Sequence, residues 1–246
     1  MKEVIIGIVP TSTYHDEKNI EPYDDKYTYI NMYGKRILEN GGVPIGILLN
    51  DEKVDYRILD MCDGFVIPGG KKICRFDYEI VHYAIKNNKP LLGICLGFQV
   101  LAIYSKVMEN KNITSFEEFN QEYQRLKKLN DGSLLQEVND SIHDNKITYK
   151  RIDYSHLIYI IDSDSKLYDI YKKSCLNVVS LHKYSVKCIG DSFKITAIAP
   201  DNVIEAIEYN NKDKFIIGMQ WHPELKDDLV FKKLIWEAKK RKEGKK

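Results

Sequence analysis

The sequence predicts an α/β fold with an open, mostly parallel central sheet, helices on both faces of that sheet, and some antiparallel strands in the C-terminal half. In the first half, short apolar runs alternate with amphipathic stretches at helical spacing, as in parallel strands joined by right-handed helical crossovers. In the second half, strand-like runs follow one another closely. Antiparallel pairing is therefore expected for several of them.

The expected elements of the first half are bounded by changes of hydrophobic period and by glycines. Apolar side chains between residues 27 and 38 recur at helical spacing, and Gly41-Gly42 ends that helix. Pro68-Gly69-Gly70 ends a buried apolar run. The expected strands cover residues 4–9, 43–49, 64–67 and 90–94, and the expected helices cover 27–38, 54–60 and 77–87.

The second half begins with a polar stretch, residues 106–152, in which 115–129 has the pattern of a helix. Strand-like runs follow, and residues 229–238 form a last amphipathic helix. The strand-like runs cover 156–161, 176–180, 193–199, 203–209 and 215–219. Because no internal repeat or low-complexity linker divides the chain, residues 1–246 are expected to form a single domain.

Composition excludes several classes of protein. The 37 Lys+Arg and 36 Asp+Glu residues nearly cancel, so no global field attracts nucleic acid or anionic lipid. No apolar run is long enough to cross a membrane, and the first residues lack the features of a signal peptide. Five cysteines without a CxxC spacing indicate neither a disulfide framework nor a zinc site. A reduced, cytoplasmic protein without metal or cofactor is expected.

A cysteine lies where a buried strand meets a helix. Residues 91–99 read LLGICLGFQ, so Cys95 stands between Gly93 and Gly97. This is the pattern of a nucleophile elbow, whose sharp turn leaves no room for neighbouring side chains. The turn would place the sulfur at a helix N-terminus, where the positive end of the dipole favours the thiolate. A lone cysteine is more often a structural core residue, but the two glycines favour a nucleophile.

A histidine and a carboxylate follow the last strand-like run, in residues 218–224, GMQWHPE. Side chains two apart in an extended segment point to the same side, so His222 and Glu224 can face one site. A carboxylate that accepts from one ring nitrogen leaves the other nitrogen free to meet a thiol. Taken alone, the motif is explained equally well by a surface turn.

Two glycines follow the strand expected at residues 64–67. Because they carry no side chains, Gly69 and Gly70 can direct backbone N–H groups toward an oxyanion, although Gly-Gly turns are common. Together the three motifs supply a nucleophile, an oriented base and an oxyanion hole. They suit an open α/β sheet, whose active site lies at the carboxyl ends of its strands.

The remaining histidines and cysteines are expected to be structural. His15, His82 and His143 have polar or amphipathic neighbours and are expected at the surface. For His156 and His182, structural hydrogen bonding is as good an explanation as catalysis. The other cysteines are expected to be small core residues: Cys62, Cys74, Cys175 and Cys188.

The three motifs resemble those of the class I glutamine amidotransferase superfamily, for which a flavodoxin-like arrangement is expected. Within it, the chain most resembles the γ-glutamyl-γ-aminobutyrate hydrolase family. Softer matches extend this resemblance over nearly the whole chain, at residues 29–47, 155–157, 165–167, 179–182 and 206–208.

The resemblance implies a cysteine-dependent hydrolase that cleaves a γ-glutamyl amide, or glutamine, through a γ-glutamyl thioester. Cys95 would be the nucleophile, His222 the base and Glu224 its orienting carboxylate. The backbone of Gly70 and Leu96 would form the oxyanion hole. Residues implied to contact the substrate are Gly69, Gln99, Ser180, Leu181 and His182. A homodimer is compatible with this resemblance.

The chain departs from the hydrolase family around the leaving group. Leu96 replaces the arginine that commonly follows the nucleophile, the segment after Gly70 is short, and a Gly-Gly-Thr-Leu stretch is absent around residues 105–109. The identity of the released amine therefore stays open. Gly-Ile-Cys-Leu-Gly resembles glutaminases more closely, so the alternative is a subunit that supplies ammonia to a synthetase partner. A non-enzymatic binding protein is the third, weaker hypothesis.

Overall fold

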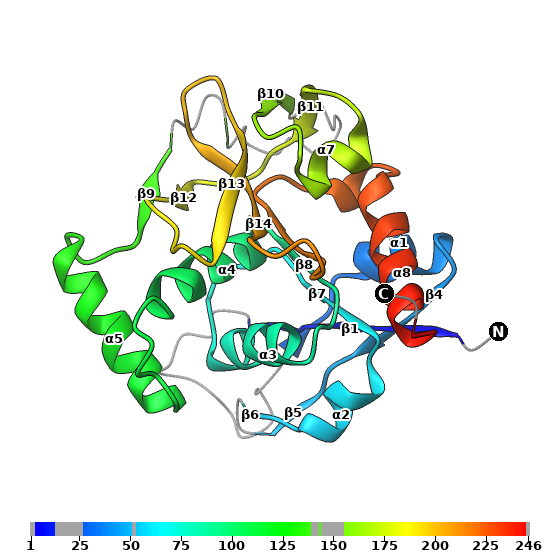
Figure 1. The fold of residues 1–246 in the computed structure, drawn as a ribbon, viewed down its shortest axis with the longest axis horizontal. Helices are drawn as coiled ribbons and strands as arrows, with labels where there is room; N and C mark the ends of the chain where they lie inside the picture. The colour runs from blue at the N-terminus through cyan, green and yellow to red at the C-terminus, as the bar shows by residue number, and fades with distance from the viewer. Residues whose placement is uncertain (1–2, 13–26, 51–52, 139–142, 144–154, 245–246) are drawn as a thin grey trace.

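A computed structural model of the chain describes residues 3–12, 27–50, 53–138, 143 and 155–244. Its centre is a nine-stranded sheet (Figure 1). The strands of this sheet are β1 (Val4–Ile8), β4 (Gly42–Gly46), β7 (Gly64–Ile67), β8 (Leu91–Ile94), β10 (Ser155–Ile160), β11 (Cys175–Val179), β13 (Phe193–Ile198), β14 (Ile204–Tyr209) and β15 (Ile216–Met219). Their order in space is β11-β10-β13-β14-β15-β8-β7-β1-β4.

Helices and short two-stranded ribbons surround this sheet. The helices are α1 (Asn31–Glu39), α2 (Tyr56–Met61), α3 (Arg75–Lys86), α4 (Leu96–Val107), α5 (Phe116–Leu129), α7 (Lys166–Tyr171) and α8 (Leu229–Lys242), with a 3₁₀ turn at Pro223–Leu225. The ribbons pair β2 (Thr11–Ser12) with β3 (Tyr27–Thr28), β5 (Leu49–Asn50) with β6 (Lys53–Val54), and β9 (Leu135–Glu137) with β12 (Tyr184–Val186).

Strand direction divides the sheet into two parts. From β4 through β1, β7 and β8 to β15, neighbouring strands are parallel. From β15 through β14, β13 and β10 to β11, neighbouring strands are antiparallel. The sheet is therefore mixed. The predicted α/β class, with parallel strands in the N-terminal half and antiparallel strands in the C-terminal half, is confirmed.

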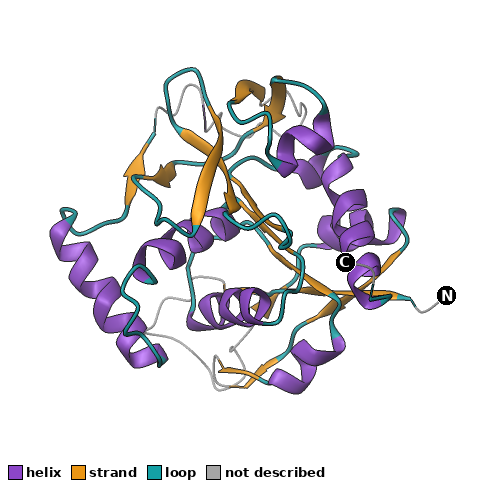
Figure 2. Ribbon diagram, in the orientation of Figure 1, coloured by secondary structure: helices purple, strands orange, loops and turns teal. Residues whose placement is uncertain are grey.

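Helices cover both faces of the sheet, as Figure 2 shows. Successive side chains of a strand point to opposite faces, so the strand β7 divides between two apolar cores. Phe65 and Ile67 pack with side chains of α3, α4 and α5, whereas Val66 packs with side chains of α1, α7 and α8. Such two-sided burial explains why β7 and β8 read as unbroken apolar runs. Within the described ranges, no helix has the length and apolarity to span a membrane.

Several local expectations need correction. Helix α1 starts at Asn31 rather than at residue 27, because Tyr27 and Thr28 pair with β2 instead. Helix α7 and the strands β9 and β12 lie in segments for which the sequence predicts no element. Cys62 and Cys74 are buried as expected. Cys175 is exposed and Cys188 is half-buried, so their assignment to the core is wrong.

Two glycines allow α4 to begin directly against the sheet. A Cβ atom on Gly93 would lie 2.5 Å from the carbonyl oxygen of Gly97. A Cβ atom on Gly97 would lie 2.3 Å from the carbonyl oxygen of Ile67, on the neighbouring strand. Both contacts are with backbone, which cannot move aside as a side chain can. The expectation that side chains have no room beside Cys95 is confirmed.

Gly97→Ala is expected to destabilise the fold even though alanine is the better helix former. The steric conflict with Ile67 should lower the free energy of unfolding by about 1–3 kcal/mol or more. Gly34→Ala is the matched control, because Gly34 is also helical and a Cβ there would have no neighbour closer than 3.8 Å. It should raise stability by about 0.5–1 kcal/mol. Urea unfolding of both variants measures this difference, and equal effects would contradict the packing argument.

Candidate active site

The three motifs meet at one edge of the sheet. Strands β7, β8 and β15 are parallel neighbours, with Ile67 paired to Gly93 and Met219 paired to Ile94. The carboxyl ends of parallel strands lie at the same edge, so the turn after β7, the cysteine after β8 and the histidine segment after β15 converge there. Segments far apart in the chain thereby form one site.

Cys95 occupies a backbone conformation that is rare for a residue with a side chain. Its φ is 52° and its ψ is −98°, in a region that favours glycine. Two backbone bonds hold it: its N–H donates to Met219 (2.8 Å), and its carbonyl accepts from Gln99 (3.2 Å) in the first turn of α4. The side chain is almost buried, with 8% of the residue exposed. A sharp turn, rather than a regular strand position, is the local structure of this cysteine.

His222 and Glu224 form a direct pair. The Nδ1–H of His222 donates to Oε1 of Glu224 at 2.7 Å. The connecting backbone is a 3₁₀ turn over Pro223–Leu225, so the expected extended geometry is wrong, but the turn still brings the two side chains together. The backbone N–H of His222 donates to the carbonyl of Val179 at 2.8 Å, which fixes the start of the turn.

The imidazole lies beside the cysteine. A Cβ atom on Gly69 would meet Cε1 of His222 at 3.0 Å and Cβ of Cys95 at 3.4 Å. A side chain at position 69 would therefore fill the space between the ring and the cysteine. Nε2 of His222 is buried and, within the described part of the chain, has no hydrogen-bond partner. This nitrogen is free to exchange a proton with the thiol or with a bound substrate.

Tyr33 is a residue of this site that the sequence analysis missed. Its hydroxyl donates to Oε1 of Glu224 at 2.9 Å and accepts the backbone N–H of Gly69 at 3.0 Å. The same hydroxyl thus ties the carboxylate to the glycine turn. The local sequence holds no signal for this role, because an aromatic residue at an apolar position of α1 predicts only core packing.

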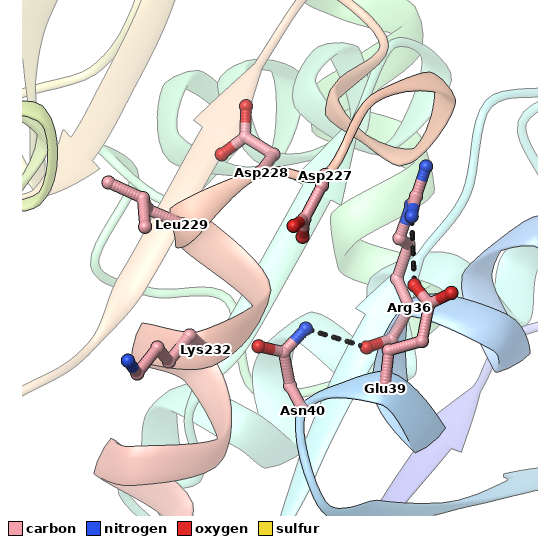
Figure 3. A pocket seen from close by; sticks show the side chains of 7 residues that line it. All are labelled: Arg36, Glu39, Asn40, Asp227, Asp228, Leu229 and Lys232. Atoms are coloured by element: carbon pink, nitrogen blue, oxygen red, sulfur yellow. Dashed lines mark hydrogen bonds and ion pairs between the residues drawn. The ribbon is translucent and has the colours of Figure 1, made fainter.

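Arg36, one turn further along α1, supports the same segment from behind. Its Nε donates to the backbone carbonyl of Glu224 at 2.8 Å, and its Nη1 pairs with Glu39 at 2.8 Å. Arg36 also lines a surface pocket between α1 and the start of α8 (Figure 3). The other residues of that pocket are Glu39, Asn40, Asp227, Asp228, Leu229 and Lys232. Helix α1 therefore positions both ends of Glu224, its side chain through Tyr33 and its backbone through Arg36.

The charge balance of the site raises the pKa of His222 to about 10. Burial alone lowers this pKa, but the neighbouring Cys95 and then Glu224 raise it by more. Because the pKa is raised, the imidazolium form persists through neutral pH and loses its proton only as the pH approaches 10. Burial, together with Glu224, raises the pKa of Tyr33 well above its ordinary value. Tyr33 thus stays neutral and keeps the proton that it donates to Glu224.

Gly70 and Leu96 lie side by side at the elbow. A Cβ atom on Gly70 would meet Cδ2 of Leu96 at 2.9 Å. Leu96 is the first residue of α4, so its backbone N–H is among those that a helix cannot satisfy internally. The assignment of these two backbone N–H groups as oxyanion donors stays a prediction.

The residues expected to contact substrate are engaged in different ways. The Gln99 amide donates to the carbonyl of Tyr184 (3.0 Å) and to Oε1 of Gln220 (3.2 Å). The Ser180 hydroxyl donates to the carbonyl of His143 at 3.0 Å. Leu181 is partly exposed, whereas His182 is buried. His182 lies with His143 and His156 in a separate cluster.

His143 is fully buried, so its expected surface position is wrong. The polar neighbours of His143 in the sequence indicate a surface position. In the structure, however, its ring packs against histidines from other segments. His82 is exposed, as expected, and its Nδ1 lies 3.0 Å from the Tyr104 hydroxyl. His15 lies outside the described residues.

The raised pKa of His222 can be tested by NMR titration of labelled histidines. Wild-type His222 should titrate near pH 10. Cys95→Ala and Glu224→Gln should each lower that pKa toward about 6.5, because each removes a neighbour that favours the imidazolium. His82 is the internal control, since burial and Lys86 lower its pKa, and neither substitution should move it. A wild-type His222 that titrates near 6.5 would contradict this account of the site.

Comparison with known proteins identifies relatives of this architecture. The chain is 27% identical over 284 residues to the glutamine amidotransferase-like protein RP404 of Rickettsia prowazekii, covering 97% of this chain and 99% of that protein. It is 26% identical over 208 residues to the CTP synthase of Thermosipho africanus, covering 76% of this chain and 37% of that enzyme.

A solved structure shares the fold at lower identity. The glutaminase domain of Trypanosoma brucei CTPS, with bound acivicin, superposes with a TM-score of 0.63 at 20% identity, covering 96% of this chain and 94% of that domain. Residues 4–74 and 74–224 of the chain match the peptidase C26 family. The chain therefore belongs to the peptidase C26 family, with a class I glutamine amidotransferase-like fold, and this membership supports an amidohydrolase.

Proposed function

We propose that this chain is a cysteine-dependent hydrolase of a γ-glutamyl amide, with Cys95 as nucleophile, His222 as acid and base, and Glu224 as the carboxylate that orients His222. The observation that carries the proposal is the placement of the Cys95 elbow beside the His222–Glu224 pair. Membership of the peptidase C26 family supports the same chemistry.

In the first half of the reaction, the thiolate of Cys95 attacks the γ-carbonyl carbon of the substrate. The oxygen becomes an oxyanion, which the backbone N–H groups of Gly70 and Leu96 stabilise. His222 carries the proton that left the thiol and donates it to the amine nitrogen as the C–N bond breaks. The amine departs and a γ-glutamyl thioester remains. The raised pKa of His222 supports this order, because the imidazolium is present at neutral pH.

In the second half, water attacks the thioester carbon. His222, now neutral, accepts a proton from that water, and the oxyanion forms again at the same two donors. Collapse of this intermediate breaks the C–S bond and releases glutamate. Cys95 returns as the thiolate beside the imidazolium, so atoms and charges balance over the cycle.

The alternative is a glutaminase subunit that delivers ammonia to a synthetase. The match with this chain covers 37% of the CTP synthase of Thermosipho africanus. The matching region is therefore one part of a longer enzyme, as expected if a glutaminase works together with a second activity. Both hypotheses use the same acyl-enzyme chemistry. They differ in whether the isolated chain turns over.

A turnover panel on the purified chain separates the two hypotheses. Glutamine, γ-glutamyl-γ-aminobutyrate and several other γ-glutamyl amides are compared for release of ammonia or amine. Unaided hydrolysis of γ-glutamyl amides with secondary amide nitrogens, in preference to glutamine, is expected for the proposed hydrolase. Glutamine hydrolysis that stays negligible until another protein is added would instead favour the glutaminase subunit.

Cys95→Ala should abolish turnover of the best substrate in that panel, because no other group can form the thioester. Cys175→Ala is the matched control, since Cys175 is an exposed thiol and should be replaceable without loss. Trapping of an acyl-enzyme by mass spectrometry should succeed with the control and fail with Cys95→Ala. Wild-type turnover in Cys95→Ala would end the proposal.

Tyr33→Phe should slow turnover without removing any group that touches substrate. Loss of a hydrogen bond to a charged group costs about 1.5–3 kcal/mol, so kcat/KM should fall roughly 10- to 100-fold. The effect should appear mainly in kcat, with a shift in the alkaline limb of the pH profile, because Tyr33 acts through Glu224 and His222. Tyr104→Phe removes a buried hydroxyl that bonds to His82 and should leave both readouts unchanged. An equal loss in the two variants would indicate a general packing effect.

A further inference from the structure

Four buried side chains outside the proposed catalytic site converge on one point. They are His143, His156 at the start of β10, His182 between β11 and β12, and Glu205 in β14. His143 and Glu205 are fully buried, and His156 and His182 are 8% and 4% exposed. One nitrogen of each ring and one carboxylate oxygen all lie within 4.8 Å of one another. The proposed hydrolysis uses none of these groups as acid, base or nucleophile.

The spacing of these atoms is that of ligands around a small cation. Oε1 of Glu205 lies 3.3 Å from Nδ1 of His143, 3.4 Å from Nε2 of His182 and 3.6 Å from Nε2 of His156. Ligands bound at zinc's usual distances to nitrogen and oxygen, at the corners of a tetrahedron, are roughly 3.3–3.5 Å apart. The three separations from the carboxylate oxygen are thus close to three edges of such a tetrahedron, and all four atoms lie within 4.8 Å of one another.

These inward-facing atoms are also unsatisfied. Among the described residues, Nδ1 of His143, Nε2 of His156 and Nε2 of His182 have no hydrogen-bond partner, and neither carboxylate oxygen of Glu205 has one. A buried carboxylate without a partner is costly, and so are buried ring nitrogens. Four of these atoms, the three nitrogens and Oε1 of Glu205, lie around one point, where a single cation would be a partner for all four.

The outward-facing ring nitrogens are each held by an acceptor. Nε2 of His143 lies 2.9 Å from Oδ2 of Asp201. Nδ1 of His156 lies 2.9 Å from the carbonyl of Leu157, and Nδ1 of His182 lies 3.1 Å from the carbonyl of Tyr184. In the neutral form of each ring, such an acceptor favours the tautomer whose proton is on the outer nitrogen. The inner nitrogen then presents its lone pair to the centre, as in the second shell of histidine metal sites.

We propose that His143, His156, His182 and Glu205 bind one divalent transition-metal ion, with zinc as the best match. Three imidazoles and one carboxylate are ligands that zinc accepts, and tetrahedral geometry is its usual choice. Because four protein ligands fill the coordination shell and all are buried, the site is structural. It differs from a catalytic zinc centre, which keeps one position open for water or substrate.

The ion would hold together the backbone that carries His222. The carbonyl of His143 accepts from His182 N–H and from the Ser180 hydroxyl, both at 3.0 Å. The adjoining Val179 carbonyl accepts from His222 N–H, and the Glu205 carbonyl accepts from Gln220 N–H, both at 2.8 Å. Two of the ligand-bearing segments thus bracket residues 220–222. Binding of the ion is expected to stiffen this part of the site.

The test uses the full chain without a histidine tag, in the Cys95→Ser background so that the elbow thiol cannot bind metal. Protein purified without chelator should contain about one zinc per chain by inductively coupled plasma mass spectrometry. Removal of the metal should lower Tm, and added Zn²⁺ should restore Tm in a concentration-dependent way. Glu205→Gln and His156→Ala should lose the bound metal and the Zn²⁺-dependent rise in Tm. His82→Ala, a histidine outside the cluster, should retain both.

Cobalt(II) keeps the proposal testable where a ligand variant fails to fold. Metal-free protein with four intact ligands should take up one Co²⁺ and show the visible absorption of a tetrahedral ion without a thiolate charge-transfer band. Failure to bind either Zn²⁺ or Co²⁺, a thiolate band, or equal metal loss in His82→Ala and His156→Ala would overturn the proposal. None of these readouts depends on turnover, so the metal site and the proposed hydrolysis can fail separately.

Discussion

The close contact between the start of α4 and the strands beneath it is the constraint on which the site depends. Gly97 lies against the carbonyl of Ile67, and Gly93 lies against the carbonyl of Gly97. Because of this packing, the chain must turn sharply between β8 and α4. Cys95 lies at this turn and therefore has a positive φ. Since β7 and β15 flank β8 in parallel, the same contact determines where the glycine turn and the histidine segment stand relative to the sulfur.

Features that depend on neighbouring residues could be predicted from the sequence. The apolar runs before Pro68 and Cys95 indicate two-sided burial, and the glycines that flank Cys95 indicate a tight turn. His222 and Glu224 meet because they are two residues apart, although their backbone forms a 3₁₀ turn rather than an extended segment. Tyr33 could not be predicted. It reaches Glu224 across 191 residues of chain, and its local pattern is that of any aromatic residue on the buried face of a helix.

The histidine cluster was missed for a related reason. Familiar zinc motifs place two cysteines or histidines within a few residues, so that one local spacing reveals them. Here the four side chains come from four separate segments, and His143 has polar neighbours that indicate a surface position. The sheet order β11-β10-β13-β14 brings His156, His182 and Glu205 together. The expectation that the chain lacks a metal site rested on the absence of a local motif, which a site of this kind does not need.

Main-chain hydrogen bonds connect the histidine cluster to the proposed catalytic site, and they affect His222 and Cys95 to different extents. His222 is held by Val179, and Gln220 is held by Glu205, so a disturbance of the histidine cluster reaches the proposed base through two main-chain hydrogen bonds. Cys95 shares part of this route, because the Met219 carbonyl that accepts its N–H belongs to the same peptide group as the Gln220 N–H. Cys95 has a second anchor, however, since its own carbonyl accepts from Gln99 in the first turn of α4. Loosening of the histidine cluster should therefore lower the fraction of molecules in which His222 is correctly placed, while the turn that carries Cys95 stays formed. A protein in that state would still be acylated at Cys95 by a reactive substrate, yet it would transfer protons poorly in both halves of the reaction.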